Sequence, residues 1–275
     1  MELLNGKEIA KQIVEQCKKD VQSNNLHIKV VDILVGEDEG SLVYIKNKQK
    51  KFNEVGIDFE LVKISENISE KELVQRIKAY NNDSLVNGIF IEMPLPKHLN
   101  TSKIINSIEP KKDLEGCTNY NLGAIINKEN EIAPCTAEGI VRLLKSYNIE
   151  IGGKNCVIVG RSNIVGKPVA LLMLNENATI TICHSKTQNL KEICKKADIL
   201  IVSINKTKFI NRDFIKTGSI VVDVGIHNTD NGIVGDVDFE DIKDLVSYIT
   251  PVPGGVGSMT TAILIEHTLK KVKKS

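Results

Sequence analysis

Short apolar runs alternate with longer amphipathic stretches along the first part of the chain. Residues 28–35 and 86–91 are apolar runs, and residues 57–63 alternate between apolar and polar side chains as a half-buried strand does. Apolar residues recur at helical spacing in residues 8–22 and between the three strand patterns. The order strand, helix, strand, helix, strand predicts a mainly parallel sheet with right-handed crossovers.

Start and stop signals predict where the helices between these strands begin and end. Ser41 is placed to open one helix and Gly56 to end it. Ser69 and Glu72 form a capping box, which predicts a second helix that continues to about Tyr80.

A second alternation of the same kind follows Pro134. Thr136 is placed to cap a helix that runs to about Tyr147, and further helices are expected from about Gly166, near residues 188–196 and at the end of the chain. Apolar runs predict four more strands, at residues 155–159, 178–183, 198–202 and 219–224. The pattern therefore predicts an α/β protein with two α/β domains.

Composition and charge narrow the class of protein. The 275 residues are 41% hydrophobic and 26% charged, as in an ordinary globular enzyme of two modest domains. The formal net charge of +1 provides no field that favours nucleic acid or a membrane surface, and no run approaches transmembrane length. The six cysteines form no C-x-x-C pair and no metal-binding cluster. We therefore expect a cytoplasmic protein with reduced thiols, no metal site, and no nucleic-acid or membrane partner.

The stretch from Asn155 to Pro168 predicts a turn that could bind a ligand. Its apolar run ends at Gly160, and a helix can begin near Gly166. A turn between a strand and a helix directs backbone N–H groups and the positive end of the helix dipole at a ligand, which suits a phosphate. The spacing is not G-x-G-x-x-G, so a turn without a ligand explains this stretch equally well when it is taken alone.

Tyr44 and Lys48 are a candidate catalytic pair in the first domain. They lie four residues apart in a predicted helix, so both side chains project from one face, which borders the carboxyl edge of the sheet. A phenol beside an ammonium can orient the lysine for proton transfer, although a solvated pair on a lysine-rich helix has the same spacing. The Y-x-x-x-K pattern also occurs in short-chain dehydrogenases, but there it follows the glycine-rich turn, whereas here it precedes Gly160.

Further motifs complete an ordered series along the whole chain. They are Val35-Gly36 with Ser41-x-x-Tyr44-x-x-x-Lys48, Pro94-Leu-Pro96, Pro134-Cys-Thr136, Gly160-Arg-Ser-x-Ile-Val-Gly166-x-Pro168, Cys183-His-Ser185-x-Thr187, Asp223-Val-Gly225, Gly235-Asp-Val237 and Thr250-Pro-Val-Pro-Gly-Gly-Val-Gly257. In order and spacing this series resembles the bifunctional methylenetetrahydrofolate dehydrogenase/methenyltetrahydrofolate cyclohydrolase family. Each motif is weak by itself, and the complete series is highly specific.

The resemblance implies a folate-binding catalytic domain at residues 1–135, completed by a C-terminal helix at residues 258–275. It also implies a Rossmann-like NADP-binding domain at residues 136–257 and a cleft between the domains where pterin and nicotinamide meet. The implied function is NADP-dependent oxidation of 5,10-methylenetetrahydrofolate to 5,10-methenyltetrahydrofolate, followed by hydrolysis to 10-formyltetrahydrofolate in one-carbon metabolism. A homodimer is likewise implied.

Roles for individual residues follow from the resemblance by position. The implied catalytic residues are Tyr44, Lys48 and Glu92. The implied cofactor-binding residues are Gly160, Arg161, Ser162, Ser185 and Ile226. The implied substrate-binding residues are Tyr44, Glu115, Pro253, Gly254 and Gly255. Arg161 and Ser185 could hold a 2′-phosphate, which favours NADP over NAD, although an arginine at a turn can also be a plain surface residue.

Two departures from the family pattern bear on the mechanism. Glu92 replaces a glutamine, and Glu115 replaces an aspartate that holds the pterin ring. Because a carboxylate favours the charged form of a nearby lysine, Glu92 should make Lys48 a poorer base. One alternative function is therefore a dehydrogenase with weak or absent cyclohydrolase activity. A second is a folate- or nucleotide-binding protein without activity, against which the intact Tyr44, Lys48 and Arg161 argue.

Overall fold

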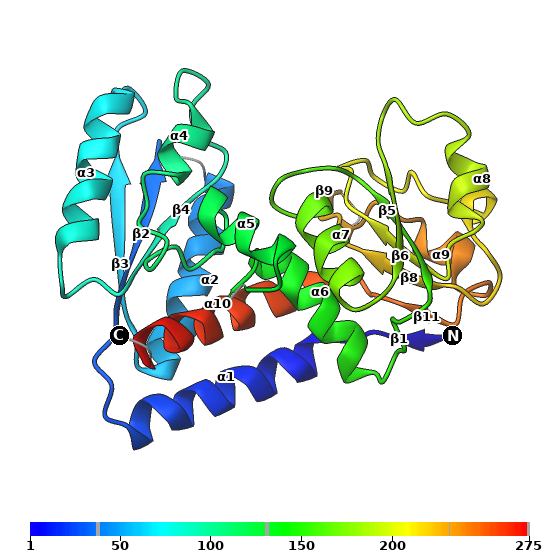
Figure 1. The fold of residues 1–275 in the computed structure, drawn as a ribbon, viewed down its shortest axis with the longest axis horizontal. Coiled ribbons are helices and arrows are strands. Elements are labelled where there is room, and N and C mark those ends of the chain that lie inside the picture. The colour runs from blue at the N-terminus through cyan, green and yellow to red at the C-terminus, as the bar shows by residue number, and fades with distance from the viewer. Residues whose placement is uncertain (37–38, 130–131, 231, 274–275) are drawn as a thin grey trace. The chain divides into compact units, whose positions relative to one another are not determined.

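Two sheets organise the chain, each within its own unit (Figure 1). The computed structural model describes residues 1–36, 39–129, 132–230 and 232–273. We call the two units the three-stranded unit and the six-stranded unit, after their parallel sheets. The three-stranded unit comprises Gln12–Ala124, Asn130–Ile132 and Leu264–Ser275, and the six-stranded unit comprises Met1–Lys11, Ile125–Glu129 and Ala133–Ile263. Two α/β units with parallel sheets confirm the predicted fold class.

The sheet of the three-stranded unit has the order β3-β2-β4, with all strands parallel. Its strands are β2 (Lys29–Val35), β3 (Asp58–Ile64) and β4 (Gly88–Ile91). The helices that contribute to this unit are α1 (Gly6–Ser23), α2 (Glu39–Val55), α3 (Glu70–Asn82), α4 (Thr101–Ile105), α5 (Asn119–Ile126) and the C-terminal α10 (Val256–Lys273). The order strand, helix, strand, helix, strand from β2 to β4 is confirmed.

Helices cover both faces of this sheet, which explains why β2 is buried almost from end to end. On one face, Ile33 and Ile89 pack in one core cluster with Leu73 and Ile77 of α3. On the other face, Phe52 of α2 contacts rings from β3 and β4, with centroid distances of 5.4 Å to Phe59 and 5.6 Å to Phe90. Successive residues of a strand point to opposite faces, so β2 contributes side chains to both layers.

The predicted helix signals agree with the structure in part. Ser69 and Glu72 form the expected capping box at the start of α3, and α2 ends at Val55, before Gly56 with φ +93°. The prediction for Ser41 was wrong, because α2 already begins at Glu39. Thr136 was also wrong as a cap, because α6 begins at Cys135 and Thr136 lies within it.

The sheet of the six-stranded unit has the order β1-β11-β8-β7-β5-β6 and is parallel throughout. Its strands are β1 (Glu2–Leu3), β5 (Asn155–Val159), β6 (Thr179–Cys183), β7 (Ile199–Val202), β8 (Ile220–Asp223) and β11 (Tyr248–Ile249). Its helices are α6 (Cys135–Ser146), α7 (Gly166–Asn175), α8 (Leu190–Cys194), α9 (Phe239–Ile242) and the 3-10 helix Arg212–Phe214. The four strands predicted here are confirmed, whereas β1 and β11, with two residues each, are too short for a periodic signal.

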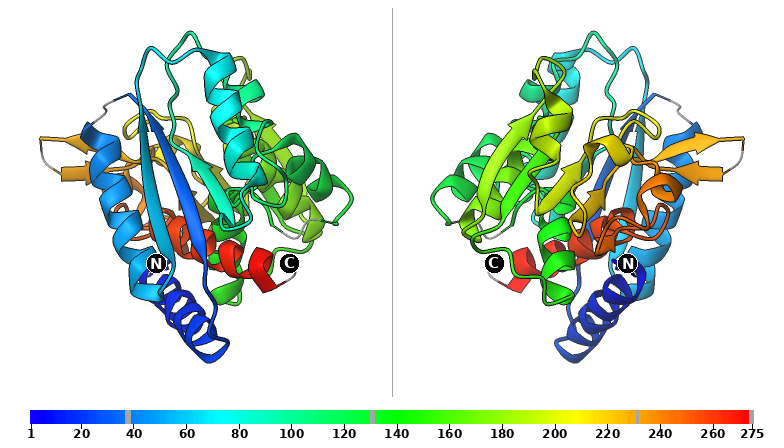
Figure 2. Two further views of the ribbon diagram at one scale, coloured as in Figure 1. Left: turned by 90° about the vertical axis from the view of Figure 1, so that its left-hand side faces the viewer. Right: turned by 90° about the vertical axis from the view of Figure 1, so that its right-hand side faces the viewer.

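An antiparallel hairpin completes this unit. It consists of β9 (His227–Thr229) and β10 (Gly232–Val234), and it projects from its unit, drawn in orange in Figure 2. The sequence pattern did not predict it. Over the residues that the structure describes, every helix is too short or too polar to cross a lipid bilayer.

Candidate active site

Lys48 is the centre of a charged cluster inside the three-stranded unit. Its side chain projects from α2 and is only 3% exposed. Its Nζ atom lies 2.7 Å from Oδ2 of Asp32 and also contacts the carboxylate of Glu92. The Tyr44 ring, which is 45% exposed, has its centroid 5.6 Å from the same nitrogen. Tyr44 and Lys48 therefore share a helix face, as their spacing predicts.

The sheet positions both carboxylates next to the ammonium. Asp32 lies in β2, paired in register with Phe90 of the neighbouring β4. Glu92 directly follows β4, and its backbone N–H donates to the carbonyl of Ile33, at 3.0 Å. Because this bond continues the ladder past the last residue of β4, the position of Glu92 is set by strand pairing rather than by a loose loop.

Aromatic rings surround the remaining sides of the ammonium. Lys48 Nζ lies 4.9 Å from the ring centroid of Phe90 and 5.9 Å from that of Phe59. A ring face attracts a cation and excludes water at the same time. The ammonium is therefore removed from solvent and stabilised by carboxylates and ring faces together.

The sequence analysis did not predict Asp32. This residue is fully buried, at 0% exposed, in a strand whose other residues are almost all apolar. A carboxylate is rarely buried unless it is paired, so an aspartate in the middle of the run Val30-Val-Asp-Ile-Leu34 was a signal that could have revealed it. The partner could not be read from the sequence, because Lys48 is brought to β2 only by packing of α2 on the sheet.

Burial and mutual repulsion shift the pKa values in this cluster. Burial raises the pKa of Asp32 to about 7, since the attraction of Lys48 offsets only part of it and Glu92 raises it further. Burial also raises the pKa of Glu115 to about 8, again against the attraction of Lys48. For Lys48, burial lowers the pKa, but Asp32, Glu92 and Glu115 outweigh this and raise it above its usual value. Lys48 is thus held as an ammonium, and the carboxyls are the groups that titrate near neutral pH.

Glu115 lies in a loop that a neighbouring aspartate holds in place. The buried Asp113 carboxylate accepts hydrogen bonds from the N–H groups of Gly116 and Thr118, at 2.9 and 2.8 Å, and from the Asn121 side chain. Leu114 packs so closely on Gly88 that a Cβ atom there would lie 2.0 Å from a Leu114 methyl carbon. The loop is therefore rigid on both sides of the half-buried Glu115.

The six-stranded unit contains the predicted turn between β5 and α7. Gly160 ends β5 with φ +131°, and a Cβ atom at this position would lie 2.2 Å from the carbonyl oxygen of Ser203, so only glycine fits. The Ser162 hydroxyl accepts from the N–H groups of Val165 and Gly166, at 3.1 and 3.3 Å. These bonds keep the turn tight where α7 begins, so that the positive end of the helix dipole lies at the carboxyl end of the strand.

The other predicted cofactor residues lie beyond the ends of neighbouring strands. Arg161 follows β5 and Ser185 follows β6, the strand paired directly with β5, and both side chains are exposed. Ile226 follows β8 and is 59% exposed, which is unusual for an isoleucine in a folded domain. Exposed groups at the carboxyl edge of a parallel sheet are placed where α/β proteins bind nucleotides.

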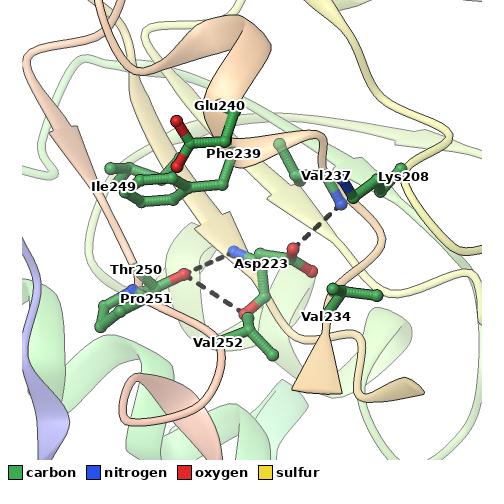
Figure 3. A pocket seen from close by; sticks show the side chains of 11 residues that line it. Lys208, Asp223, Val234, Val237, Phe239, Glu240, Ile249, Thr250, Pro251 and Val252 are labelled. Atoms are coloured by element: carbon green, nitrogen blue, oxygen red, sulfur yellow. Dashed lines mark hydrogen bonds between the residues drawn. The ribbon is translucent and has the colours of Figure 1, made fainter. Parts of the chain in front are cut away.

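The loop that contains Pro253, Gly254 and Gly255 is fixed at its start by Thr250. The Thr250 hydroxyl accepts from the Asp223 N–H at 2.8 Å, beside a cavity of about 250 Å³ (Figure 3). At the other end, a Cβ atom on Gly255 would lie 2.7 Å from the Pro251 carbonyl oxygen. The peptide bond before Pro253 is cis. This loop is therefore a tightly determined segment of the six-stranded unit.

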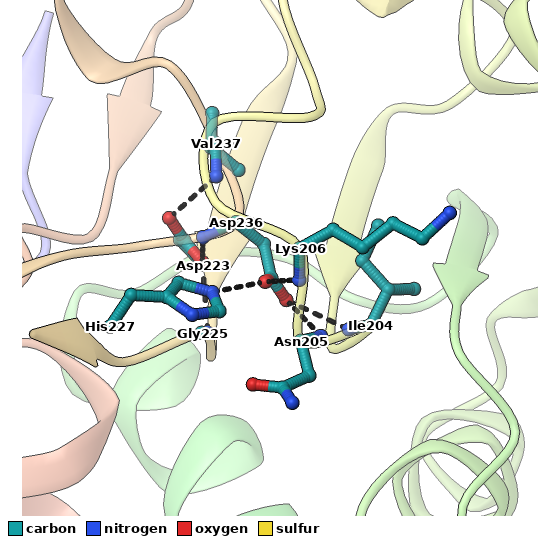
Figure 4. A network of polar contacts seen from close by, with 8 residues as sticks. All are labelled: Ile204, Asn205, Lys206, Asp223, Gly225, His227, Asp236 and Val237. Atoms are coloured by element: carbon teal, nitrogen blue, oxygen red, sulfur yellow. Dashed lines mark hydrogen bonds and ion pairs between the residues drawn. The ribbon is translucent and has the colours of Figure 1, made fainter.

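Two buried aspartates organise the loops that follow β7 and β8. Asp236 accepts hydrogen bonds from the backbone N–H groups of residues 204, 205 and 206 and contacts the His227 ring at 2.9 Å (Figure 4). Asp223 accepts from the N–H groups of Gly225, Asp236 and Val237. Burial raises the pKa of Asp223 to about 6, although these backbone donors favour its ionised form.

Comparisons with known proteins agree with this arrangement over both units. The model of the tetrahydrofolate dehydrogenase/cyclohydrolase catalytic domain matches residues 4–115, and that of the family's NAD(P)-binding domain matches residues 134–275. A bifunctional protein FolD from Clostridium botulinum is 47% identical to the chain, with 99% of this chain and 98% of the relative covered. This chain belongs to the tetrahydrofolate dehydrogenase/cyclohydrolase family.

Solved structures of the family have the same fold. The bifunctional FolD methylenetetrahydrofolate dehydrogenase/cyclohydrolase from Campylobacter jejuni has a TM-score of 0.95 and is 42% identical, with 100% of this chain and 99% of the other covered. The Trypanosoma brucei methylenetetrahydrofolate dehydrogenase-cyclohydrolase, solved with NADP and an inhibitor, has a TM-score of 0.93 and is 30% identical, covering 99% of this chain and 97% of the other. These similarities extend beyond single motifs to both units.

The residues of the NAD(P)-binding domain are suited to a dinucleotide. The positive end of the α7 dipole lies at this turn, and the exposed Arg161 supplies a cation and hydrogen-bond donors beside it. Ser162 and Ser185 add exposed hydroxyl groups. Anionic phosphates match this donor set, so the residues present fit the cofactor that the family binds.

Proposed function

We propose that this family member is an NADP-dependent 5,10-methylenetetrahydrofolate dehydrogenase that also hydrolyses 5,10-methenyltetrahydrofolate. The observation that carries this proposal is the buried Lys48 ammonium beside the exposed Tyr44 ring, in a chain that matches both domains of the family. The name of the Clostridium botulinum relative, a bifunctional protein, supports both activities. The inactive folate-binding alternative has no support of this kind.

In the dehydrogenase step the protein's task is to bind and orient. NADP, when bound, supplies the acceptor for a hydride from the one-carbon bridge of the substrate. Gly160, Ser162 and Ile226 would hold the cofactor, and Arg161 with Ser185 would bind its 2′-phosphate through charge-assisted hydrogen bonds. This step requires no acid or base from the chain, so the charge of Lys48 does not limit it.

In the hydrolase step the protein must manage a proton. A water oxygen bonds to the methenyl carbon and loses one proton, which gives a neutral hydroxyl adduct. The bond from that carbon to N5 then breaks while the hydroxyl proton is transferred to N5, so that the formyl group stays on N10 and one proton is released overall. Lys48, oriented by Tyr44, would act on this proton. As an ammonium, Lys48 can donate a hydrogen bond to the oxygen, but it serves as a base only after it has lost its own proton.

A dehydrogenase with weak hydrolase activity is the second candidate function. The observation that favours it is the contact of the Lys48 ammonium with two carboxylates, Asp32 and Glu92, where an amide at residue 92 would leave one. A lysine so held is a poorer base near neutral pH. The two candidates differ in the hydrolase rate and not in the dehydrogenase rate.

We also propose folate-binding roles and domain limits as the resemblance implies them. Glu115 would accept hydrogen bonds from the amino and amide N–H groups of the pterin, while Pro253, Gly254 and Gly255 would line the substrate site. The folate-binding domain would comprise residues 1–135 with 258–275, and the NADP-binding domain residues 136–257. The rigid loop around Glu115, held by Asp113, supports the first of these roles.

A homodimer in the cytoplasm is the state in which we expect the protein to act. The resemblance implies the dimer, and the ordinary composition with a net charge of +1 supports a protein without nucleic-acid or membrane partners. Sedimentation analysis of the pure protein tests the dimer. A single monomeric species at micromolar concentration would contradict it.

Two assays on the pure protein test the function. The first follows NADP-dependent absorbance growth with methylenetetrahydrofolate, and the second follows decay of added methenyltetrahydrofolate, corrected for hydrolysis by buffer. Activity in both assays is expected. Absence of dehydrogenase activity would overturn the proposal, whereas a dehydrogenase without hydrolase activity would establish the second candidate.

Arg161→Ala tests the cofactor assignment. The KM for NADP should rise while that for NAD changes little, because a charge-assisted contact worth about 1.5–3 kcal/mol is lost only with the phosphorylated cofactor. Lys167→Ala, at an exposed lysine in the first turn of α7, is the matched control for loss of a nearby positive charge. Equal effects of Arg161→Ala on both cofactors would show that Arg161 does not contact the 2′-phosphate.

Glu115→Ala tests the pterin contact. Folate binding should weaken in both half-reactions, because the carboxylate that accepts the pterin N–H groups is removed, and Glu115→Asp should be tolerated. Titration of each variant with tetrahydrofolate measures the affinity. Unchanged folate affinity in Glu115→Ala would remove Glu115 from the substrate site.

A further inference from the structure

Asp32 is a buried carboxylate that the family signatures do not include. It is fully buried in β2, and its Oδ2 atom lies 2.7 Å from Lys48 Nζ. Among the residues that the structure describes, no donor forms a hydrogen bond of standard geometry with either Asp32 oxygen. The carboxylate is therefore held by its ion pair with Lys48, in contrast to Asp113 of the same unit, which accepts three hydrogen bonds.

A purely structural role does not account for this arrangement. The residues on either side of Asp32 in β2 are buried and apolar, so a valine would fit the strand without the cost of burying a charge. Buried ion pairs contribute little net stability compared with apolar residues of similar size. What the Asp32 carboxylate does provide, once it is ionised, is a negative charge held next to the catalytic lysine in the core of the unit.

We propose that Asp32 is a positioning residue for Lys48, which fixes the ammonium between β2 and the end of β4 and sets the pH range in which this lysine can accept a proton. The inference rests on the proposed hydrolase function of Lys48. Two carboxylates contact Lys48, and Asp32 is the more deeply buried of the two, because it is fully buried while Glu92 is slightly exposed.

Every element packed around Lys48 contributes to its charge balance. β2 contributes Asp32, the segment after β4 contributes Glu92, and the loop after residue 112 contributes Glu115. The helix α2 itself contributes Tyr44, and β3 contributes only a neutral ring, Phe59. One cation thus lies near three carboxyl groups. Near neutral pH the carboxyl groups therefore share a proton, while Lys48 remains an ammonium.

The charge balance predicts what happens when Asp32 is made neutral. Asp32→Asn keeps the size of the side chain and removes the fully buried carboxylate that contacts Lys48. The ammonium then loses its proton at lower pH, so the hydrolase rate should reach its plateau at a pH lower by about one unit or more. The dehydrogenase kcat should stay within about threefold of the wild type, because hydride transfer does not use the lysine as a base.

The experiment compares pH profiles of methenyltetrahydrofolate hydrolysis for the wild type, Asp32→Asn and Asp32→Val. Asp32→Val places a residue that suits a buried strand at this position, so the test can still be made if Asp32→Asn does not fold. Asp58→Asn is the matched control, because Asp58 is an exposed carboxylate at the start of β3 in the same sheet. A pH profile of both Asp32 variants that coincides with that of the wild type would overturn the proposal.

A second measurement does not depend on folate chemistry. In protein labelled with ¹³C-lysine, the Cε chemical shift of Lys48, identified by its loss in Lys48→Met, reports the protonation of the amine. We expect this signal to titrate at lower pH in Asp32→Asn than in the wild type, while Asp58→Asn leaves it unchanged. An identical titration in Asp32→Asn and wild type would contradict the role of Asp32. If the wild type has no hydrolase activity, the proposed function is contradicted. The titration of Lys48 then still decides whether Asp32 controls its protonation.

Discussion

Both units bury carboxylates that accept backbone N–H groups, Asp113 among them, but Asp32 of the three-stranded unit is satisfied in a different way. In the six-stranded unit, Asp223 and Asp236 each accept three backbone N–H groups (Figure 4). In the three-stranded unit, Asp32 has a lysine as its partner. Backbone N–H groups cannot lose a proton at ordinary pH, so the first pair holds loops in place and only its own carboxyls can titrate. A lysine can lose its proton, so the second arrangement couples a buried charge to chemistry.

The difference also shows which buried charges point to function. The loops held by Asp236 need a rigid anchor, and several short hydrogen bonds to a carboxylate provide one. Asp32 accepts no backbone N–H group, and the side chains that it interacts with are Lys48, which the motif predicts to be catalytic, and Glu92. A buried carboxylate that accepts no backbone N–H group and is paired with a titratable side chain is therefore the better indicator of a reactive site in this fold.

Replacement of Lys48 should have the largest effect on activity. Lys48→Met removes the group that acts on the proton, so the hydrolase rate should fall by about 10²–10⁴-fold, while dehydrogenase activity falls much less. Lys50→Met is the matched control, because Lys50 lies on the same helix with 77% of its side chain exposed. Rates of methenyltetrahydrofolate decay for both variants provide the comparison. A Lys48→Met hydrolase that matches the control would exclude Lys48 from catalysis.

Removal of a loop anchor should have the largest effect on stability. Asp236→Ala leaves three backbone N–H groups and His227 without their acceptor, which should lower the free energy of unfolding by about 3 kcal/mol or more. Urea unfolding measures this, with the exposed Asp244→Ala as control. A decrease in the free energy of unfolding of less than about 1 kcal/mol would mean that the hydrogen bonds to Asp236 do not hold these loops in place.

Substitution of Glu92 should have a smaller effect that concerns the reactive arrangement alone. Glu92→Gln removes the more exposed of the two carboxylates that contact Lys48, so the pKa of Lys48 should fall and the lysine should lose its proton more readily. The hydrolase rate near neutral pH should then rise, by up to about tenfold if the pKa of Lys48 falls by about one pH unit. Rates against pH for wild type, Glu92→Gln and the exposed control Glu54→Gln test this. A rate lowered by Glu92→Gln would instead identify Glu92 as the base.

The smallest expected effect is on how stability depends on pH. Burial raises the pKa of Asp32 to about 7 in the folded protein. Between about pH 4 and pH 7 the Asp32 carboxyl is therefore protonated in the folded state and ionised in the unfolded state. This contribution to stability is present at low pH and is lost as the pH rises through about 7. Asp32→Asn should therefore reduce the decrease in unfolding free energy between about pH 4 and pH 7, a slope of at most about 1.4 kcal/mol per pH unit.

Asp223 provides the contrast for this last measurement. Its pKa is raised to about 6, so its contribution is lost about one pH unit earlier than that of Asp32. Asp223→Asn should alter the slope between about pH 4 and pH 6 and leave the slope near pH 7 as in the wild type. Equal slopes near pH 7 for wild type and Asp32→Asn would mean that Asp32 stays ionised throughout.

The sequence by itself determined the α/β class, the two parallel sheets, seven of the strands and most of the long helices. These features depend on local periodicity and on residues such as Gly56, Ser69 and Gly160, whose effects act within a few positions of the chain. The ordered motifs determined the family, which the matches over both units confirm. The sequence pattern did not predict β1, β11 or the hairpin β9–β10. These strands have two or three residues each, which is too short for a periodic pattern.

Only the tertiary structure decided which charges meet at Lys48. The spacing of Tyr44 and Lys48 is a property of one helix, but Asp32 and Glu92 reach the ammonium from β2 and from the end of β4. Lys48 and Glu92 lie 44 positions apart in the chain. Strand register and the packing of α2 on the sheet bring them together, where burial raises the pKa of Asp32 and the surrounding carboxylates raise the pKa of Lys48 against the effect of its own burial. Burial and charge proximity are properties of the packed fold, so an aspartate in an apolar strand could be noticed in the sequence while its partner could not.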